Sequence, residues 1–575
     1  MCKNFLIWGE TIVWKVNKNI LYYTLEILIS ITIITTTLLS QNIKFKQEEK
    51  KVTITDNKAE EYFYERSYSK AIKEYNNILL NDKENSWWEI KISEIYSVEG
   101  DLKNSKKNID IAKKMIMTDK NKTRRIKVSN YIIFTELMNK DYNLALKDGQ
   151  EVLKNYPKNT PIYKTMFTVF MANNVFNLAS DLISNYPLNT ESAYDMAEYS
   201  RMLMMVGRWD EGFSFLRKAC DIDIDEYKIY DVLSQSYNYN KDTLMSKITI
   251  LSEKNPHDIA YKMWLAKIYS LSVDTSDQAN TIINSIDTLK AGKIEINLIK
   301  ANIFQNSNQL LKSDELLNSI IKQYPNDYRV LHTAGWYYLN KKDYTNALKY
   351  CKQSIVKNKD YPDNYSFLMP EILKAQNKSI EGEPYFRIAL SKEPYNYNIM
   401  LNIANYYWVT SQNLDKSIEY FKLAEIIKPS DSEIKYSMAS VYLNAKRQIE
   451  AIDLLKQCIK IDASVPKYHR MLGTIYLIQK NSIDGIKEIR LAYQADQQDI
   501  LTLSNAGCYY ITFEADLSRG LFNLQKAFQG IDSSTDVYTK EKINDNYTKA
   551  KKLQGDYSNG KSNDKLKIPE FILFY

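Results

Sequence analysis

The sequence predicts an all-α protein built as a solenoid of helical hairpins, and three observations support this prediction. Residues 398–497 contain one hairpin pattern that recurs every 34 residues. The chain of 575 residues is too long for one hydrophobic core. It contains only 15 Gly and 12 Pro, few for a β-rich or linker-rich protein. A fixed period of this length is typical of stacked repeats, in which no single unit can bury its apolar face alone.

One small residue marks the middle of each expected hairpin. Because two antiparallel helices approach closely only where one contributes a small side chain, we expect these positions to be buried. Leu244 departs from the rule. A large side chain usually stands nine residues earlier, as at Trp408, Tyr442 and Tyr476. The small positions are Ala71, Ser105, Ala145, Ala179, Gly212, Leu244, Ala279, Ser313, Ala347, Gly382, Ser417, Ala451, Gly485 and Gly520.

Prolines followed by short polar residues separate the hairpins. Examples are Pro157 in NYPKNT, Pro325 in QYPNDY and Pro429 in IKPSDS. A proline at such a point cannot continue the preceding helix, and Asn, Asp or Ser caps the next one. We therefore expect helix starts directly after these motifs.

This pattern resembles the tetratricopeptide repeat (TPR) family. The resemblance implies a right-handed superhelical solenoid of about fourteen TPR-like hairpins over residues 52–531, degenerate over 52–258 and clearer over 259–531. Pro370 departs from the motif, since it stands where the first helix of a unit has Gly or Ala. The match is closest at Leu331, Ala334, Gly335, Tyr338 and Ala347, and again at Leu472, Gly473 and Tyr476.

The apolar composition of residues 20–40 predicts one transmembrane helix, which follows a short flank at residues 1–19. The run at 20–39 is mostly apolar and would span roughly 30 Å as a helix, the thickness of a bilayer core. Glu26 is the one charge within it, and lysines flank both ends, so the orientation stays open. A cleaved signal or a buried helix is the alternative. Residues 41–51 form a polar connector.

The C-terminal part predicts a cap and a tail. Residues 532–555 read as a polar capping helix for the last repeat. Residues 556–575 form a tail that begins with Gly, Ser, Asn and Lys and ends in the apolar run IPEFILFY. This run either folds back on the last repeats or is a docking peptide for a partner.

No motif in the sequence indicates catalysis. The five cysteines lack metal-ligand spacing and are interpreted as buried small hydrophobes. We expect His257, His332 and His469, which lie in different units, to be solvated residues on helix faces. No nucleotide-binding or hydrolase motif occurs, and 77 basic and 70 acidic residues form no basic stripe. We therefore expect no enzyme activity, no cofactor or metal, and no nucleic-acid partner.

The family resemblance implies where a partner would bind. In tetratricopeptide proteins the first helices of successive hairpins line a concave face that binds peptides. Aromatic, Arg and Asn side chains there suit peptide capture, although the alternative is that they pack between repeats. Arg470 and Asn505 match two members of the family's carboxylate clamp, but Thr474 stands where an Asn is expected. The implied peptide-binding residues are His332, Trp336, Phe367, Tyr406, Tyr436, Arg470 and Asn505.

The sequence thus predicts a membrane protein, single-pass and non-catalytic, that acts as a scaffold or adaptor for protein or peptide partners. One alternative is a structural accessory subunit of an envelope secretion or polysaccharide-export complex. Another is an exported soluble repeat protein with a cleaved signal. The oligomeric state and the side of the membrane that holds the repeats stay open.

Overall fold

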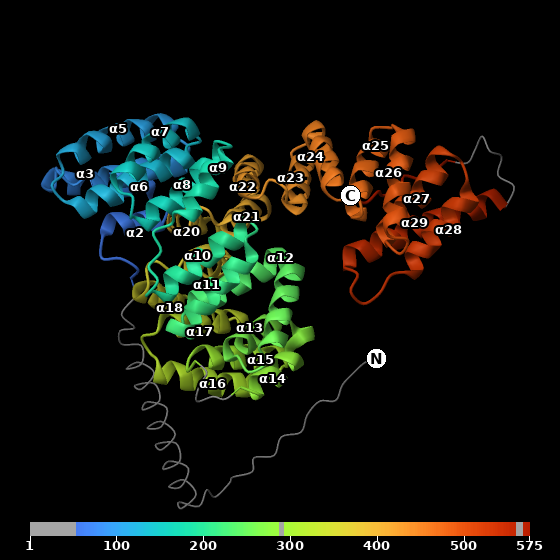
Figure 1. Cartoon of the computed structure of the whole chain (residues 1–575). Coiled ribbons are helices and arrows are strands. Elements are labelled where there is room, and N and C mark those ends of the chain that lie inside the picture. Colours follow the sequence, from blue (N-terminus) through green and yellow to red (C-terminus); the bar gives the residue numbers. More distant parts are fainter. Residues whose placement is uncertain (1–52, 287–291, 559–566) are drawn as a thin grey trace, which may run out of the picture. The chain divides into compact units, whose positions relative to one another are not determined.

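Figure 1 shows a computed structural model that describes residues 53–286, 292–558 and 567–575, in which the regular elements are all helices and no strand occurs. The predicted flank at residues 1–19, the membrane segment at 20–40 and the connector at 41–51 lie outside these residues. Of the helices that are described, none is long and apolar enough to cross a bilayer.

Antiparallel helix pairs follow one another along the chain, as the predicted hairpins do. The N-terminal helices are α2 (Lys58–Tyr64), α3 (Tyr68–Asn81), α4 (Ser86–Glu99), α5 (Leu102–Thr118), α6 (Lys122–Met138), α7 (Tyr142–Asn155), α8 (Thr160–Ala172), α9 (Phe176–Ser184), α10 (Ala193–Met205), α11 (Trp209–Ile222), α12 (Tyr227–Lys254), α13 (Ile259–Tyr269), η1 (Val273–Thr275) and α14 (Ser276–Asn284). The middle helices are α15 (Glu295–Asn306), α16 (Leu310–Gln323), α17 (Tyr328–Asn340), α18 (Tyr344–Lys357), η2 (Asn364–Leu368), α19 (Met369–Ala375), η3 (Ser379–Gly382), α20 (Glu383–Lys392), α21 (Tyr397–Asn405), η4 (Tyr406–Thr410) and α22 (Leu414–Ile427). The last are α23 (Ser432–Asn444), α24 (Gln448–Ile461), α25 (Pro466–Ile478), α26 (Ser482–Ala495), α27 (Ile500–Phe513), α28 (Leu517–Gln529) and α29 (Val537–Ser558).

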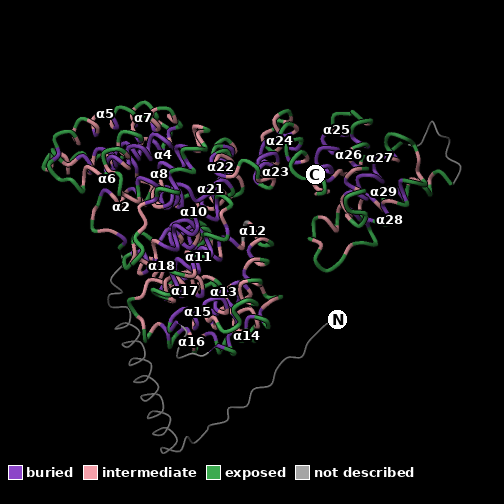
Figure 2. Tube along the Cα trace, viewed as in Figure 1, coloured by how far each residue is buried: buried purple, intermediate pink, exposed green. Residues whose placement is uncertain are grey.

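Every predicted small position is buried. Figure 2 shows buried backbone concentrated where neighbouring helices meet. A Cβ added to Gly485 would lie 2.5 Å from Leu477 Cδ2, and one added to Gly520 would lie 2.3 Å from Ile511 Cγ1. Leu244, the exception in sequence, is fully buried in α12. That helix holds both arms of its hairpin and bends at Asn240, which has non-helical backbone angles. The packing prediction is confirmed.

The helix starts predicted directly after the proline motifs are also confirmed. Asn159 caps α8 and accepts a hydrogen bond from the Ile162 amide. Asp327 caps α17 and Asp431 caps α23 in the same way. Each cap satisfies amides that lack a partner in the first turn of a helix.

Pro370 has a visible structural consequence. It lacks the amide that would donate to the Ser366 carbonyl, and the preceding turn, η2, is a π-helix. The Ser366 carbonyl accepts instead from the Asn402 side chain of the next hairpin. The departure from the repeat motif is thus compensated by a neighbouring unit.

Hairpins far apart in the sequence pack against one another. One hydrophobic cluster includes residues of α4, α8 and α10 together with residues of α18, α21 and α23. α2 contacts α20, and α8 contacts α22 (Figure 1). Arg66 and Glu383 form an ion pair of 2.7 Å across this contact. Part of the inner surface of the first hairpins is therefore covered by later hairpins of the same chain.

Charged side chains are also buried where early hairpins pack against later ones. Lys228 in α12 is fully buried and pairs with Glu198 of α10 at 2.8 Å and with Glu393, just before α21. Arg201 also pairs with Glu393, at 2.9 Å. Burial alone would raise the pKa of Glu198, but Lys164, Lys228 and Arg201 outweigh it and hold that pKa below its usual range. The pairs of Lys228 and Arg201 with Glu393 join hairpins that the sequence separates widely.

Candidate functional site

The last hairpins hold the end of the chain itself. Residues 567–575 have no regular secondary structure and lie against α25, α27 and α29. These nine residues are the last part of the predicted tail at 556–575, and the name "tail" refers to them alone below. We call the surface that holds them the tail groove. Of the two interpretations of the IPEFILFY run, the structure has the run folded back on the last repeats.

Two asparagines bind the tail backbone. Asn505 of α27 donates to the Phe574 carbonyl at 2.7 Å and accepts from the Phe574 amide at 2.8 Å. Asn546 of α29 does the same with Ile572, at 2.8 Å and 2.9 Å. Both asparagine side chains are fully buried. The two clamped residues are two positions apart, the period at which an extended chain presents its groups to one side.

Three further polar side chains contact the tail. Thr474 of α25 donates to the Phe574 carbonyl at 2.7 Å. Lys549 of α29 donates to the Glu570 carbonyl at 3.0 Å. Arg470 of α25 donates to the Tyr575 carbonyl at 3.4 Å and is ion-paired with Asp499, the cap of α27. Most hydrogen bonds to the tail thus reach its backbone, which every peptide has.

The apolar side chains of the tail enter the core between the helices. Phe574 is 7% exposed and packs with Leu503, Ala527 and Ile543. Leu573 packs between two other clusters, one around Tyr509 and one around Cys508. These contacts depend on side-chain size and hydrophobicity, so they can supply specificity that the backbone contacts lack.

A second group of predicted residues lines a separate cavity. His332, Trp336 and Phe367 lie together with Asn398 and Asn402 around a space of about 370 Å³. His332 is fixed from both sides: its Nδ1 is 2.8 Å from Asn364 Oδ1, and its Nε2 accepts from the Trp336 indole at 3.1 Å. Burial lowers the pKa of His332 to about 4.

The remaining predicted residues join neither site. Tyr406 packs edge-on against Phe386 and donates to the Ser379 carbonyl at 2.7 Å. The ring of Tyr436 lies 5.5 Å from that of Tyr468. The seven residues are therefore divided among the tail groove, the His332 cavity and contacts between helices.

The prediction of solvated histidines holds only for His257. His332 is half-buried, and His469 is buried with its Nδ1 2.6 Å from Glu488 Oε2. The reason is that the first helix of each hairpin is covered on several sides by its neighbours. Cys220, Cys351, Cys458 and Cys508 are buried and free, as the sequence indicated, and Cys2 lies outside the described residues.

No pattern in the sequence points to Asn546, although the groove depends on it. Its helix follows the last repeat, so no periodic position pointed to it. Thr474 was noted only as a departure from the clamp, yet its hydroxyl both donates to the tail and accepts from Asn505 at 2.9 Å. Within residues 53–286, 292–558 and 567–575, no group of three or more His, Cys, Asp or Glu side chains could hold a metal ion.

No protein-family model matches the chain, and neither does any curated protein sequence. Among solved structures it is similar to yeast Tom70, with 16% identity, a TM-score of 0.34, and coverage of 85% of this chain and 97% of that one. It is also similar to Naa15/Naa10 bound to HypK (13% identity, TM-score 0.38, coverage 87% and 90%). A third is YrrB, described as a TPR protein with an unusual peptide-binding site (14% identity, TM-score 0.26, coverage 34% and 97%). With TM-scores this low, none of them supports an inference about what this chain binds.

Proposed function

We propose that the chain is a non-catalytic scaffold that binds extended, apolar peptide segments in the tail groove, and that its own tail competes for that groove. One observation carries the proposal: Asn505 and Asn546 each make a pair of hydrogen bonds to the tail backbone, at Phe574 and Ile572. An asparagine amide has the same donor and acceptor as a peptide group, so it can pair with any extended backbone.

Competition by the tail follows from its attachment to the groove. A tethered segment faces its site at a high effective concentration, so a free peptide must compete with it. A partner would therefore need either higher affinity than residues 567–575 or help in displacing them. Phe571 packs with Leu573 against the cluster around Cys508. Partners should therefore carry an extended segment with bulky apolar side chains at the positions of Phe571, Leu573 and Phe574.

The test measures binding of a fluorescent peptide with the sequence of residues 567–575 by anisotropy. Phe574→Glu in the full chain would place a carboxylate in an apolar pocket and release the tail. We expect this variant to bind the peptide at least 10-fold more tightly than the natural chain. Adding Asn505→Ala should weaken binding about 10-fold or more, because two hydrogen bonds of about 1 kcal/mol each are lost.

Asn523→Ala provides the matched control, since the half-buried Asn523 side chain donates its hydrogen bond to the Arg519 carbonyl of its own helix and does not touch the groove. This variant should leave peptide binding unchanged. Equal binding by the natural chain and by Phe574→Glu, or no binding by either, would contradict the proposal.

A membrane tether at residues 20–40 is part of the same proposal. The apolar run in the sequence supports it, and a tether would confine the groove to partners at the same membrane. Sedimentation of the chain with membranes after an alkaline wash tests this part, and recovery of the intact chain in the supernatant would contradict it.

A further inference from the structure

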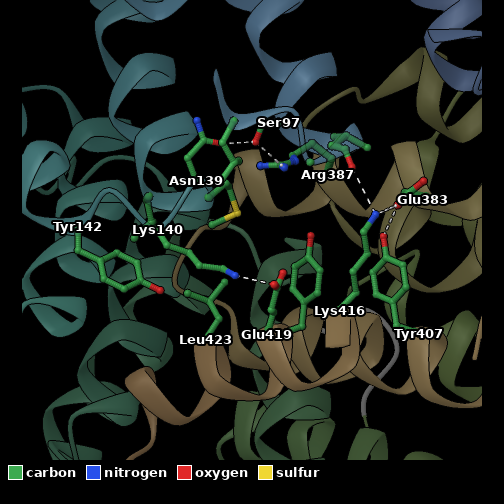
Figure 3. Close-up of a pocket in the computed structure, with 16 residues that line it drawn as sticks. Ser97, Asn139, Lys140, Tyr142, Glu383, Arg387, Tyr407, Lys416, Glu419 and Leu423 are labelled. Carbon is green, nitrogen blue, oxygen red and sulfur yellow. Dashed lines mark hydrogen bonds and ion pairs between the residues drawn. The ribbon is translucent and has the colours of Figure 1, made fainter. Parts of the chain in front are cut away.

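A second cavity lies where early and middle hairpins meet, away from the tail groove (Figure 3). It has a volume of about 240 Å³. Ser97 comes from α4, Arg387 and Glu383 come from α20, and Lys416 and Glu419 come from α22. We call it the Arg387 cavity. Helices that are far apart in the sequence thus line one cavity. Ser97 and Arg387, which are hydrogen-bonded to each other, are separated by 290 residues.

The floor of the Arg387 cavity is buried and its mouth is exposed. Arg387 is 6% exposed, Ser97 8% and Asn139 5%. By contrast, the side chains of Lys140 and Glu419 at the mouth are 51% and 45% exposed. Figure 3 shows the Arg387 guanidinium beside Ser97 and Asn139, while Lys140 reaches toward Glu419 and Lys416 reaches toward Glu383.

Arg387 has no acidic partner among the described residues. Its Nη2 donates to Ser97 Oγ at 3.0 Å, while its Nε and Nη1 are buried without a hydrogen-bond partner. Ser97 cannot supply negative charge, because its hydroxyl is neutral and donates to Asn139 Oδ1 at 2.6 Å.

The acids around the cavity are already paired with other cations. Glu383 binds Lys416 at 2.6 Å and Arg66 at 2.7 Å. Glu419 binds Lys140 at 2.5 Å. The lining therefore contains one more cation than anion: Lys140, Lys416 and Arg387 against Glu383 and Glu419.

A buried cation without a counter-charge is strongly unfavourable, so such groups are normally paired. Arginine also offers planar, charged donors that suit the oxygens of carboxylate and phosphate. The cavity lies below the usual size of sites for drug-sized molecules. It is therefore suited to a small ligand rather than to a folded partner.

We propose that the Arg387 cavity binds a small free oxyanion, a phosphate or a short-chain carboxylate, with Arg387 as its charged ligand. Lys140 and Lys416 attract the anion, and the Arg387 guanidinium, whose charge no acidic side chain of the described residues balances, holds it. Because α4, α20 and α22 all line the cavity, a bound anion stabilises the contact between early and middle hairpins. Binding therefore raises the thermal stability of the whole chain.

Thermal unfolding of the full chain tests this site. Sodium phosphate and sodium acetate are titrated separately at constant ionic strength, which is held with sodium chloride. We expect the Tm of the natural chain to rise by a few degrees and then saturate with at least one of the two anions, as linked binding requires. Saturation with phosphate alone assigns a phosphate-type ligand, and saturation with acetate alone assigns a carboxylate.

Arg387→Met keeps an apolar stem of similar length but removes the charge, and it should abolish the anion-dependent shift in Tm. Arg519→Met, at a side chain that is 54% exposed, is the matched control and should keep the shift. Isothermal titration of the natural chain with phosphate and with acetate gives a readout that needs no variant. No saturable binding of either anion, or the same shift in Arg387→Met as in the natural chain, would overturn the proposal.

Discussion

At the scale of single residues, neutral amides bind the tail. Asn505 and Asn546 are fully buried yet fully used, since each gives both its donor and its acceptor to a tail residue. A buried amide without such partners would cost about 1–3 kcal/mol. The buried groove is therefore suited to being filled by an extended chain, whether that chain is the tail or a partner.

His332 is a titratable side chain that likewise uses both of its polar atoms in hydrogen bonds. Nε2 accepts from the Trp336 indole, and Asn364 Nδ2 donates to Ser354, which leaves Asn364 Oδ1 to accept from His332 Nδ1. This arrangement requires the neutral ring with its proton on Nδ1. A second proton on Nε2 would face the indole N–H.

We therefore predict that acid destabilises the fold through His332. Its folded pKa of about 4 lies below the ordinary value of about 6.5, so the unfolded chain takes up a proton first as the pH falls. Stability is fully present above pH 6.5 and is lost as the pH falls from there to about 4. Between pH 7 and pH 5 the natural chain should lose about 2 kcal/mol more than His332→Gln in urea unfolding.

His257→Gln, at an exposed histidine, is the control for this measurement and should follow the natural chain. Equal losses for the natural chain and for His332→Gln would show that His332 does not titrate in this way.

At the scale of elements, the turns inside the hairpins follow one rule. In twelve of the fourteen hairpins, all except those of Leu244 and Ala279, the residue five positions before the small residue has a positive φ, which only glycine adopts without strain. Most of these positions are not glycine; the set is Arg66, Gly100, Lys140, Asn174, Gly207, Asn308, Lys342, Asn377, Gln412, Lys446, Lys480 and Ala515. The backbone conformation of the turn therefore repeats with the same period as the sequence pattern. The residue types at this position vary, so the sequence alone does not show the repeat.

Lys342→Gly should stabilise the chain by about 0.5–1 kcal/mol, because the exposed Lys342 has a φ of 61° and glycine removes that strain. The measurement is the midpoint of urea unfolding, which should rise. Gly207→Ala is the reciprocal variant, with a φ of 84° and no atom within 4 Å of the new Cβ. It should lower the midpoint, and a rise in that variant would refute the strain argument.

The sequence predicted the elements well because each hairpin is stabilised locally. The contacts that form each hairpin lie within one or two units of the repeat. They involve the small positions, the caps such as Asp327 and the prolines that end helices, so all of them can be recognised from a pattern that recurs every 34 residues. Asn505 could be projected from the repeat register for the same reason. Asn546 could not, since α29 follows the last repeat and has no equivalent position earlier in the chain.

At the scale of the whole molecule, the decisive contacts are long-range and have no period. Arg66 with Glu383, and Lys228 with Glu393, join hairpins that no repeat pattern pairs. They cover inner surface that the family resemblance would leave open for a partner. The tail groove and the Arg387 cavity both depend on such contacts, which explains why the sequence indicated only part of the groove and none of the residues of the cavity.

We infer that the tail groove is a peptide site that the tail itself occupies. Hydrogen exchange of the fragment covering residues 567–575, followed by mass spectrometry in the full chain, tests it most directly. The amides of Ile572 and Phe574 donate to buried asparagines, so the fragment should exchange more slowly than the free peptide. An excess of an isotopically heavy peptide of the same sequence should displace the tail and raise its exchange towards the free rate. Exchange at the free rate before any competitor is added would contradict the account.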